Sequence, residues 1–134
     1  MNFSEEYQTK DGKKHGPYKR YIKTQDLGSL LTFECNYHEG VLEGPAAHYY
    51  DNSNPVVKGT YKNGKLHGMK KKYYVDGTLE SVCQYEHGRL VGSCKEFRPD
   101  GSLKFEGVFN DDKVRGKLYF GSGYIEFEDG KLHY

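Results

Sequence analysis

The sequence repeats itself with a period of 24 residues, and this repeat limits the possible folds more than any other feature. The segment Tyr61-Lys-Asn-Gly-Lys-Leu-His-Gly68 returns one period later as Tyr85-Glu-His-Gly-Arg-Leu-Val-Gly92. The same aromatic and glycine positions recur in the neighbouring units at Tyr37, Gly40, Gly44, Phe109 and Gly116, with Asp112 in place of one glycine. Short units in one register predict a chain of stacked structural repeats.

The second half of each unit predicts a β-hairpin. Asp76-Gly77 and Asp100-Gly101 are typical of tight turns, because glycine adopts positive φ without strain. Between the turns, apolar and polar residues alternate, as in the segment from Leu31 to Cys35. We therefore expect an all-β ribbon of antiparallel hairpins, with about five to six units of 24 residues.

The 134 residues are expected to form one domain, because the single units are too short to fold alone. We predict an enlarged N-terminal capping unit at 1–36, three regular units at 37–108 and a shortened C-terminal unit at 109–134. The first hairpin is expected to have the longest tip, at 25–29. In the last unit the aromatic and glycine positions come early, at Phe127 and Gly130, and Tyr134 ends the chain.

The composition indicates a thin aromatic layer instead of a deep aliphatic core. Hydrophobic residues make up 35% of the chain, and 13 Tyr and 7 Phe occur with no Trp. Alternation in the return strands predicts one packed face with Leu79, Cys83, Tyr85, Leu103, Phe105 and Phe109. Whether Tyr73 or Tyr74 shares the face of Leu79 depends on a bulge at the turn, because one inserted residue reverses the side-chain parity.

The charge balance argues against nucleic acid as a partner. Twenty Lys and Arg against 19 Asp and Glu give a net charge of +1, too little for a strong uniform field. The run Lys70-Lys71-Lys72 alternates faces on a strand and is interpreted as solvated. The N-terminus lacks the basic and apolar pattern of a leader, and the odd cysteines Cys35, Cys83 and Cys94 lack metal-ligand spacing. We expect reduced thiols and a cytoplasmic location, although Cys83 and Cys94 could be diagonal neighbours on adjacent strands.

One glycine recurs at the second turn of every unit, and a structural role is expected for it. We predict that these glycines leave room for the ring of a stacked unit, at Gly16, Gly44, Gly68, Gly92 and Gly116.

These units, with Tyr73-Tyr74-Val-Asp-Gly77 and Phe97-Arg-Pro-Asp-Gly101, resemble the MORN repeat, and most closely its bacterial variant of about two dozen residues. The resemblance implies a single-layer, twisted antiparallel sheet of stacked β-hairpins. Bacterial proteins of this kind are often described as antitoxin-like or immunity-like proteins that bind a toxin enzyme. Other MORN proteins act as scaffolds or have been linked to phospholipids.

The residues do not suggest an enzyme, a metal site or a cofactor. His15 and His67 occupy the same repeat position in separate units, so they are not expected to converge on a metal. No base and orienting group can be assigned to Ser81, Cys83 or Cys94 as a nucleophile.

The candidate binding residues are aromatic side chains that a one-layer sheet leaves partly in water. By repeat position they are Tyr21, Tyr49, Tyr73 and Phe97, with Tyr50 and Tyr74 beside them. Such rows suit contact with a protein partner, here a toxin or effector domain, because rigid rings lose little entropy. Packing of unit on unit is an equally good explanation. The alternative function, a phospholipid surface module, would use Lys13, Lys14, Lys70 and Lys72, and the low net charge argues against it.

Overall fold

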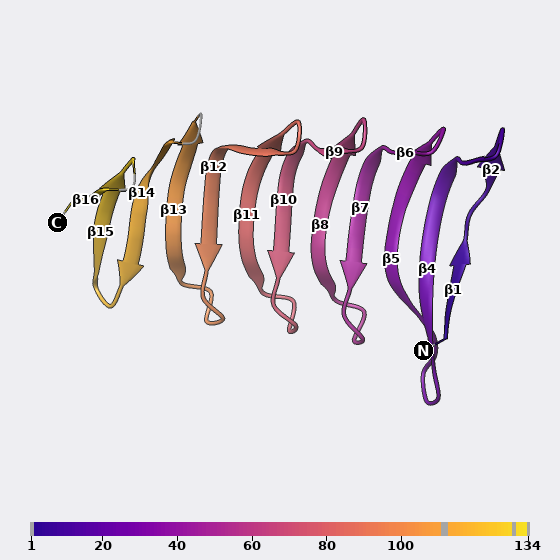
Figure 1. Ribbon diagram of the computed structural model, residues 1–134. Coiled ribbons are helices and arrows are strands. Elements are labelled where there is room, and N and C mark those ends of the chain that lie inside the picture. The colour runs from indigo at the N-terminus through magenta and orange to yellow at the C-terminus, as the bar shows by residue number, and fades with distance from the viewer. Residues whose placement is uncertain (1, 111–112, 130, 134) are drawn as a thin grey trace.

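The computed structural model describes residues 2–110, 113–129 and 131–133, and in this part of the chain it contains strands and turns but no helix. The strands stand side by side in one layer (Figure 1). They are β1 (Phe3–Glu6), β2 (Thr9–Lys10), β3 (Lys13–Lys14), β4 (Gly16–Thr24), β5 (Gly28–His38), β6 (Val41–Leu42), β7 (Gly44–Tyr49), β8 (Pro55–Lys62), β9 (Lys65–Leu66), β10 (Gly68–Tyr73), β11 (Leu79–Glu86), β12 (Arg89–Phe97), β13 (Leu103–Asn110), β14 (Lys113–Phe120), β15 (Gly123–Glu128) and β16 (Lys131–His133).

The main sheet follows the order of the chain, and every strand pair in it is antiparallel. It runs from β1 through β4, β5, β7, β8 and β10 to β16, while β6 and β9 pair with β5 and β8. The short strands β2 and β3 form a separate hairpin. The prediction of an all-β, single-layer sheet of stacked hairpins is therefore confirmed. No helix long and apolar enough to cross a membrane is present among the described residues.

At one edge of the sheet, two-residue turns join one unit to the next. Asn63 and Gly64 both have positive φ, as do His87 and Gly88, which is the geometry of a type I′ turn. The Gly64 N–H donates to the Leu42 carbonyl, and one period later the Gly88 N–H donates to the Leu66 carbonyl, at 2.9 and 2.8 Å. These bonds connect each unit to the preceding one.

At the other edge, side chains make the connection between units. The hydroxyl of Tyr50 donates to the backbone carbonyl of Tyr73 at 2.9 Å, and that of Tyr74 donates to the carbonyl of Phe97 at 2.6 Å. Arg98 occupies the repeat position of Tyr74, and its Nη2 donates to the carbonyl of Tyr119. A different residue type therefore makes the same bond in the next unit.

The repeated glycines are required for a reason other than the predicted one. Gly16, Gly44 and Gly68 have φ between 82° and 106°, and no atom lies within 4 Å of the place where a Cβ would stand. Positive φ, and not room for a ring, explains these three positions. Gly92 has positive φ, and a Cβ there would also lie only 2.5 Å from Gln84 Oε1.

Gly116 differs from the other repeated glycines, because a Cβ there would overlap the backbone of Glu106 and Gly107 on the adjacent strand. Room for a packed side chain is needed instead at the mid-strand glycines, Gly59 and Gly107. A Cβ at Gly59 would lie 2.9 Å from Leu66, and one at Gly107 would lie 2.7 Å from the Phe105 ring. Close packing therefore requires glycine within the strands.

The predicted packed face was wrong, because a bulge at each Asp-Gly turn divides its residues between the two faces of the sheet. The register shifts between Lys72 and Tyr73, so Tyr73 lies opposite Leu79, and in the next unit Phe97 lies opposite Leu103. Directly opposite residues on adjacent strands share a face. Leu79 and Leu103 therefore lie with the aromatic row, whereas Cys83, Tyr85, Phe105 and Phe109 lie on the other face.

The hydrophobic core is small and lies near the N-terminal end of the sheet. Tyr18, Cys35 and Ala46 are buried there, with Tyr18 only 1% exposed, and partly buried rings of Phe33 and Tyr37 pack against them. Burial raises the pKa of the Cys35 thiol. The predicted thin layer agrees with this small set of buried side chains.

The expectation of reduced thiols was wrong for two of the three cysteines. Cys83 and Cys94 lie directly opposite each other on β11 and β12 and form a disulfide. The sequence left open whether these two cysteines are close; the structure places them directly opposite each other instead of diagonally, in an irregular strand register. The cytoplasmic location rested in part on reduced thiols; it stays a prediction, with that support removed.

The first hairpin protrudes, but its loop is shorter than expected. Thr24 pairs with Gly28, so the loop holds only the residues between them. The hairpin reaches farther because β4 and β5 are long, at 9 and 11 residues (Figure 1). The predicted repeat positions Asp112, Gly130 and Tyr134 lie outside the described residues, and the unit boundaries at 36 and 108 stay predictions.

Candidate binding face

An aromatic row runs across one face of the sheet, close to the turns that contain Asp-Gly. Tyr21, Tyr49, Tyr73, Phe97 and Tyr119 form this row, and each lies opposite an apolar or aromatic residue, in the same order Leu31, Pro55, Leu79, Leu103 and Tyr124. All five rings of the row are half-buried. We refer to this side of the sheet as the binding face.

The structure brings together four of the six residues predicted to bind a partner. Tyr21, Tyr49, Tyr73 and Phe97 lie in the row, whereas the hydroxyls of Tyr50 and Tyr74 bond to the backbone of the next unit. Tyr50 and Tyr74 thus have a structural role, and a binding role for them stays a prediction. The sequence reasoning missed Tyr119, because Tyr119 follows Phe97 by 22 residues instead of 24. The spacing differs because the β14–β15 hairpin is shorter and lacks the bulge.

Carboxylates hold several phenols of the row in place. The hydroxyl of Tyr49 donates to Glu34 Oε1 at 2.8 Å, and that of Tyr119 donates to Glu106 Oε1 at 2.5 Å. Burial, and then the bond to Glu34, raises the pKa of Tyr49 to about 12. The bond to Glu106, and then burial, raises the pKa of Tyr119 to about 12. Both phenols therefore stay protonated well above neutral pH, and their hydrogen bonds to the two carboxylates hold the rings in place.

Tyr73 lacks such an acceptor. The repeat position of Glu34 is occupied by Lys58 in the unit of Tyr73, and no described residue accepts a hydrogen bond from the Tyr73 hydroxyl. Tyr73 therefore offers a donor to a molecule outside the chain.

A shallow cleft of about 670 Å³ lies on the binding face between β4 and β10. Its walls include Tyr49 and Tyr73 of the aromatic row, together with Lys58, Lys71 and Met69. Lys58 and Lys71 are exposed, and 42% of Met69 is exposed. The cleft therefore combines rings, cations and one flexible apolar side chain, and can contact a ligand that is both acidic and apolar.

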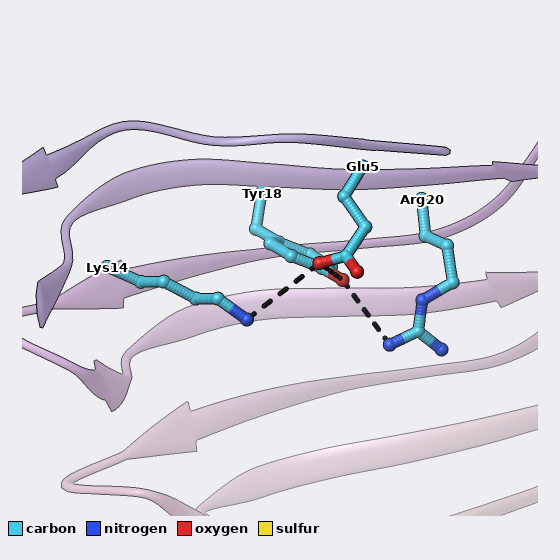
Figure 2. Close-up of polar contacts among 4 residues, drawn as sticks. All are labelled: Glu5, Lys14, Tyr18 and Arg20. Carbon is cyan, nitrogen blue, oxygen red and sulfur yellow. Dashed lines mark hydrogen bonds and ion pairs between the residues drawn. The ribbon is translucent and has the colours of Figure 1, made fainter. Parts of the chain in front are cut away.

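The opposite face contains a polar cluster near the N-terminus (Figure 2). The Tyr18 hydroxyl donates to Glu5 Oε2 at 2.7 Å, and Arg20 Nη2 donates to the Tyr18 hydroxyl at 3.3 Å. Lys14 Nζ lies 3.9 Å from Glu5 Oε2 and 4.6 Å from the centre of the Tyr18 ring.

Burial first, and then the bond to Glu5, raises the pKa of Tyr18, so its phenol is not a base at neutral pH. Glu5 and Arg20 are directly opposite each other on β1 and β4, and Glu5 contacts Tyr18 and Lys14 as well. These contacts join Glu5 of β1 to Tyr18 of β4 and to Lys14 of β3, so the cluster holds the first strand on the sheet.

The histidines form two pairs at the turns. The rings of His15 and His38 lie 5.1 Å apart, and those of His67 and His87 lie 5.3 Å apart. Nδ1 of His15 accepts a hydrogen bond from the Glu39 N–H at 3.2 Å. Among the residues that the structure describes, no group of three or more His, Cys, Asp or Glu side chains could hold a metal ion.

The fold and the binding face define an all-β repeat protein of stacked hairpins that exposes ordered side chains on an open sheet. Comparison with protein families agrees with this class: the family described as MORN repeat variant matches residues 42–63 and 90–111. The two matches begin two periods apart, in one register of the repeat. MORN repeats are binding and scaffold modules and not a known enzyme family. Comparison with curated proteins found no significant relative.

Proposed function

We propose that this protein is a protein-binding repeat module of the immunity or antitoxin type, which uses the binding face to cover a partner toxin or effector enzyme. The observation that supports this best is the aromatic row, because five half-buried rings follow one line across the sheet. Tyr and Phe anchors contribute large contact areas with few rotatable bonds, and such residues dominate the energetics of protein interfaces.

The bonds from Tyr49 to Glu34 and from Tyr119 to Glu106 add to this support. A ring that is already fixed in the free protein loses less conformational entropy when a partner binds. A repeat sheet that is one layer thick also leaves both faces open over its whole length, which suits contact with a large surface.

A membrane-surface role has weaker support in the structure. Of the lysines that such a role would use, Lys14 bonds to Glu5, and Lys70 lies over the Tyr85 ring at 5.7 Å. An anionic membrane is usually bound by clusters of about four to eight exposed cations. At both ends of the binding face, lysines lie directly opposite acidic residues.

The proposal is tested by removing two rings of the row. The partner is captured from cells of the source organism with the tagged chain, identified by mass spectrometry and purified. The double variant Tyr49→Ala with Tyr73→Ala is expected to weaken its binding by at least about 2 kcal/mol, roughly thirtyfold, because central aromatic anchors are lost. A captured enzyme is expected to lose its activity in a complex of equal stoichiometry.

A matched control removes apolar groups from the opposite face. Leu118 and Phe120 are exposed, and they alternate with Lys117 and Tyr119 along β14. Leu118→Ala with Phe120→Ala is expected to leave the affinity unchanged. Circular dichroism melts accompany both variants. Equal affinity of the two double variants, or normal binding with lost stability in the tyrosine variant, would assign the row to packing and contradict the proposal.

A further inference from the structure

A second row on the binding face consists mainly of charged side chains, two residues along most strands from the aromatic row. The strand register places its members directly opposite one another in the order Glu6, Lys19, Glu34, Ala47, Lys58, Lys71, Val82, Lys95, Glu106, Lys117 and Glu126. We call this line of side chains the charged row.

At both ends of the charged row, opposite charges face each other. Lys19 lies between Glu6 and Glu34, and Lys117 lies between Glu106 and Glu126, with 4.0 Å between Lys117 Nζ and Glu126 Oε1. Cross-strand pairs of opposite charge stabilise a sheet. The ends of the row are therefore neutralised within the chain.

The centre of the row is different, because two lysines face each other there. Lys58 lies between Ala47 and Lys71, and Lys71 lies between Lys58 and Val82. Neither lysine forms an ion pair with a described residue, and both are exposed. Like charges directly opposite each other destabilise a sheet, so the free protein bears an uncompensated positive charge at this place.

The two lysines adjoin Tyr49 and Tyr73 of the aromatic row. They line the same cleft as Tyr49, Tyr73 and Met69, and the Tyr73 hydroxyl lacks an acceptor within the described chain. Lys58 takes the repeat position at which Glu34 accepts the hydrogen bond of Tyr49. One residue difference between units therefore both frees a phenol and introduces a cation.

We propose that the centre of the binding face docks an acidic segment of the protein partner, with carboxylates at Lys58 and Lys71 and apolar side chains against Tyr49, Tyr73 and Met69. The inference rests on the proposed function and specifies the chemistry of the partner. A protein segment fits better than a membrane, because the charge is confined to two facing lysines between Ala47 and Val82 and is combined with rings. An acidic segment also relieves the repulsion between the lysines.

The test uses a fluorescein-labelled peptide, Glu-Glu-Leu-Glu-Glu-Leu-Glu-Glu, and the same peptide with Gln in place of Glu, with fluorescence anisotropy of the full chain as the readout. The wild-type chain is expected to bind the acidic peptide and not the Gln peptide, and to lose affinity as salt is added. Lys58→Glu is expected to weaken binding at least tenfold. Its melting temperature is expected to stay the same or rise, because the new carboxylate faces Lys71.

Lys72→Glu is the matched control, because it makes the same change in charge next to Lys71 but on the opposite face, where Lys72 lies opposite Val57 and Ser81. It is expected to change the affinity less than twofold. Equal losses in the two variants, or no binding of the acidic peptide by the wild-type chain, overturn the inference.

A further experiment measures binding of the same variants to vesicles of phosphatidylcholine with phosphatidylserine. Binding to these vesicles that requires Lys58, without binding of the acidic peptide, assigns the site to a membrane and also overturns it.

The purified partner separates this inference from the proposed function. Binding that is lost in Tyr49→Ala with Tyr73→Ala but kept in Lys58→Glu overturns only the acidic-segment inference. Binding that is kept in both variants contradicts the proposed function and the inference together. Loss of partner binding in both variants, with the Lys72→Glu control intact, is the expected result.

Discussion

At the scale of single residues, backbone conformation explains the most regular feature of the sequence. The backbone at Gly68 has φ of +106°, which residues other than glycine rarely adopt. No atom lies within 4 Å of the position that a Cβ would take. The aromatic side chains also differ between equivalent positions: Tyr49 is fixed by Glu34, whereas Tyr73 has Lys58 at the equivalent position. A single residue difference between equivalent positions therefore decides whether the tyrosine of a unit is hydrogen-bonded within the chain.

Gly68→Ala is expected to lower the free energy of unfolding by about 1–3 kcal/mol, because the cost of positive φ is not offset by any new contact. Gly123→Ala is the control, since Gly123 also has open space at the Cβ position but lacks positive φ. Urea unfolding followed by circular dichroism measures both changes. Equal midpoints for the two variants would show that the conformation of Gly68 carries no energetic requirement.

At the scale of the hairpin, stability depends on how each unit attaches to the next. One edge uses bonds between backbone groups, such as that from Gly88 to Leu66, and the other edge uses side-chain donors from Tyr50, Tyr74 and Arg98. A hairpin of two strands is at most marginally stable alone, so these attachments decide whether a unit stays folded. Arg98 stands where the preceding unit has Tyr74, and it makes the equivalent hydrogen bond, to the Tyr119 carbonyl, with a different side chain.

Tyr74→Phe removes one of these attachments without changing the ring. The substitution is expected to cost about 0.5–1.5 kcal/mol of stability, because the Phe97 carbonyl loses its donor. Tyr73→Phe, one residue earlier, removes a hydroxyl without a partner in the described chain and is expected to change stability by less than about 0.5 kcal/mol. Thermal melts of the two variants compare the effects, and a larger loss for Tyr73→Phe would contradict the assignment.

At the scale of the whole molecule, the protein extends in one dimension because each strand of the main sheet pairs only with its neighbours (Figure 1). The register repeats with the sequence: Gly68 pairs with Tyr85 and Gly92 with Phe109, while Tyr73 pairs with Leu79 and Phe97 with Leu103. Stability in such a protein is approximately a sum over units and the contacts between them. A unit can then be removed without changing the pairing of the rest.

Deletion of residues 78–101 is expected to leave a shorter folded sheet. Gly77 is then followed by Ser102, Tyr73 faces Leu103, and Tyr74 takes the place of Arg98 as donor to the Tyr119 carbonyl. Deletion of residues 78–89 removes half as much chain but reverses the direction of a strand, and is expected to unfold the region. Circular dichroism melts under reducing conditions, which remove the effect of the disulfide, compare the two. Equal damage from both deletions would contradict the repeat architecture.

The sequence by itself determined the period, the hairpins and the all-β class, because tight turns and strand alternation are local properties that a 24-residue repeat displays several times. It also placed Tyr49 and Tyr73 in one row, since equivalent residues of stacked units share a position. Only the tertiary structure decided which face holds Leu79, how Cys83 meets Cys94 and that Lys58 faces Lys71. Bulges shift the register by one residue, and a shift of one residue moves side chains to the other face, so partners across strands depend on pairing that spacing along the chain does not specify.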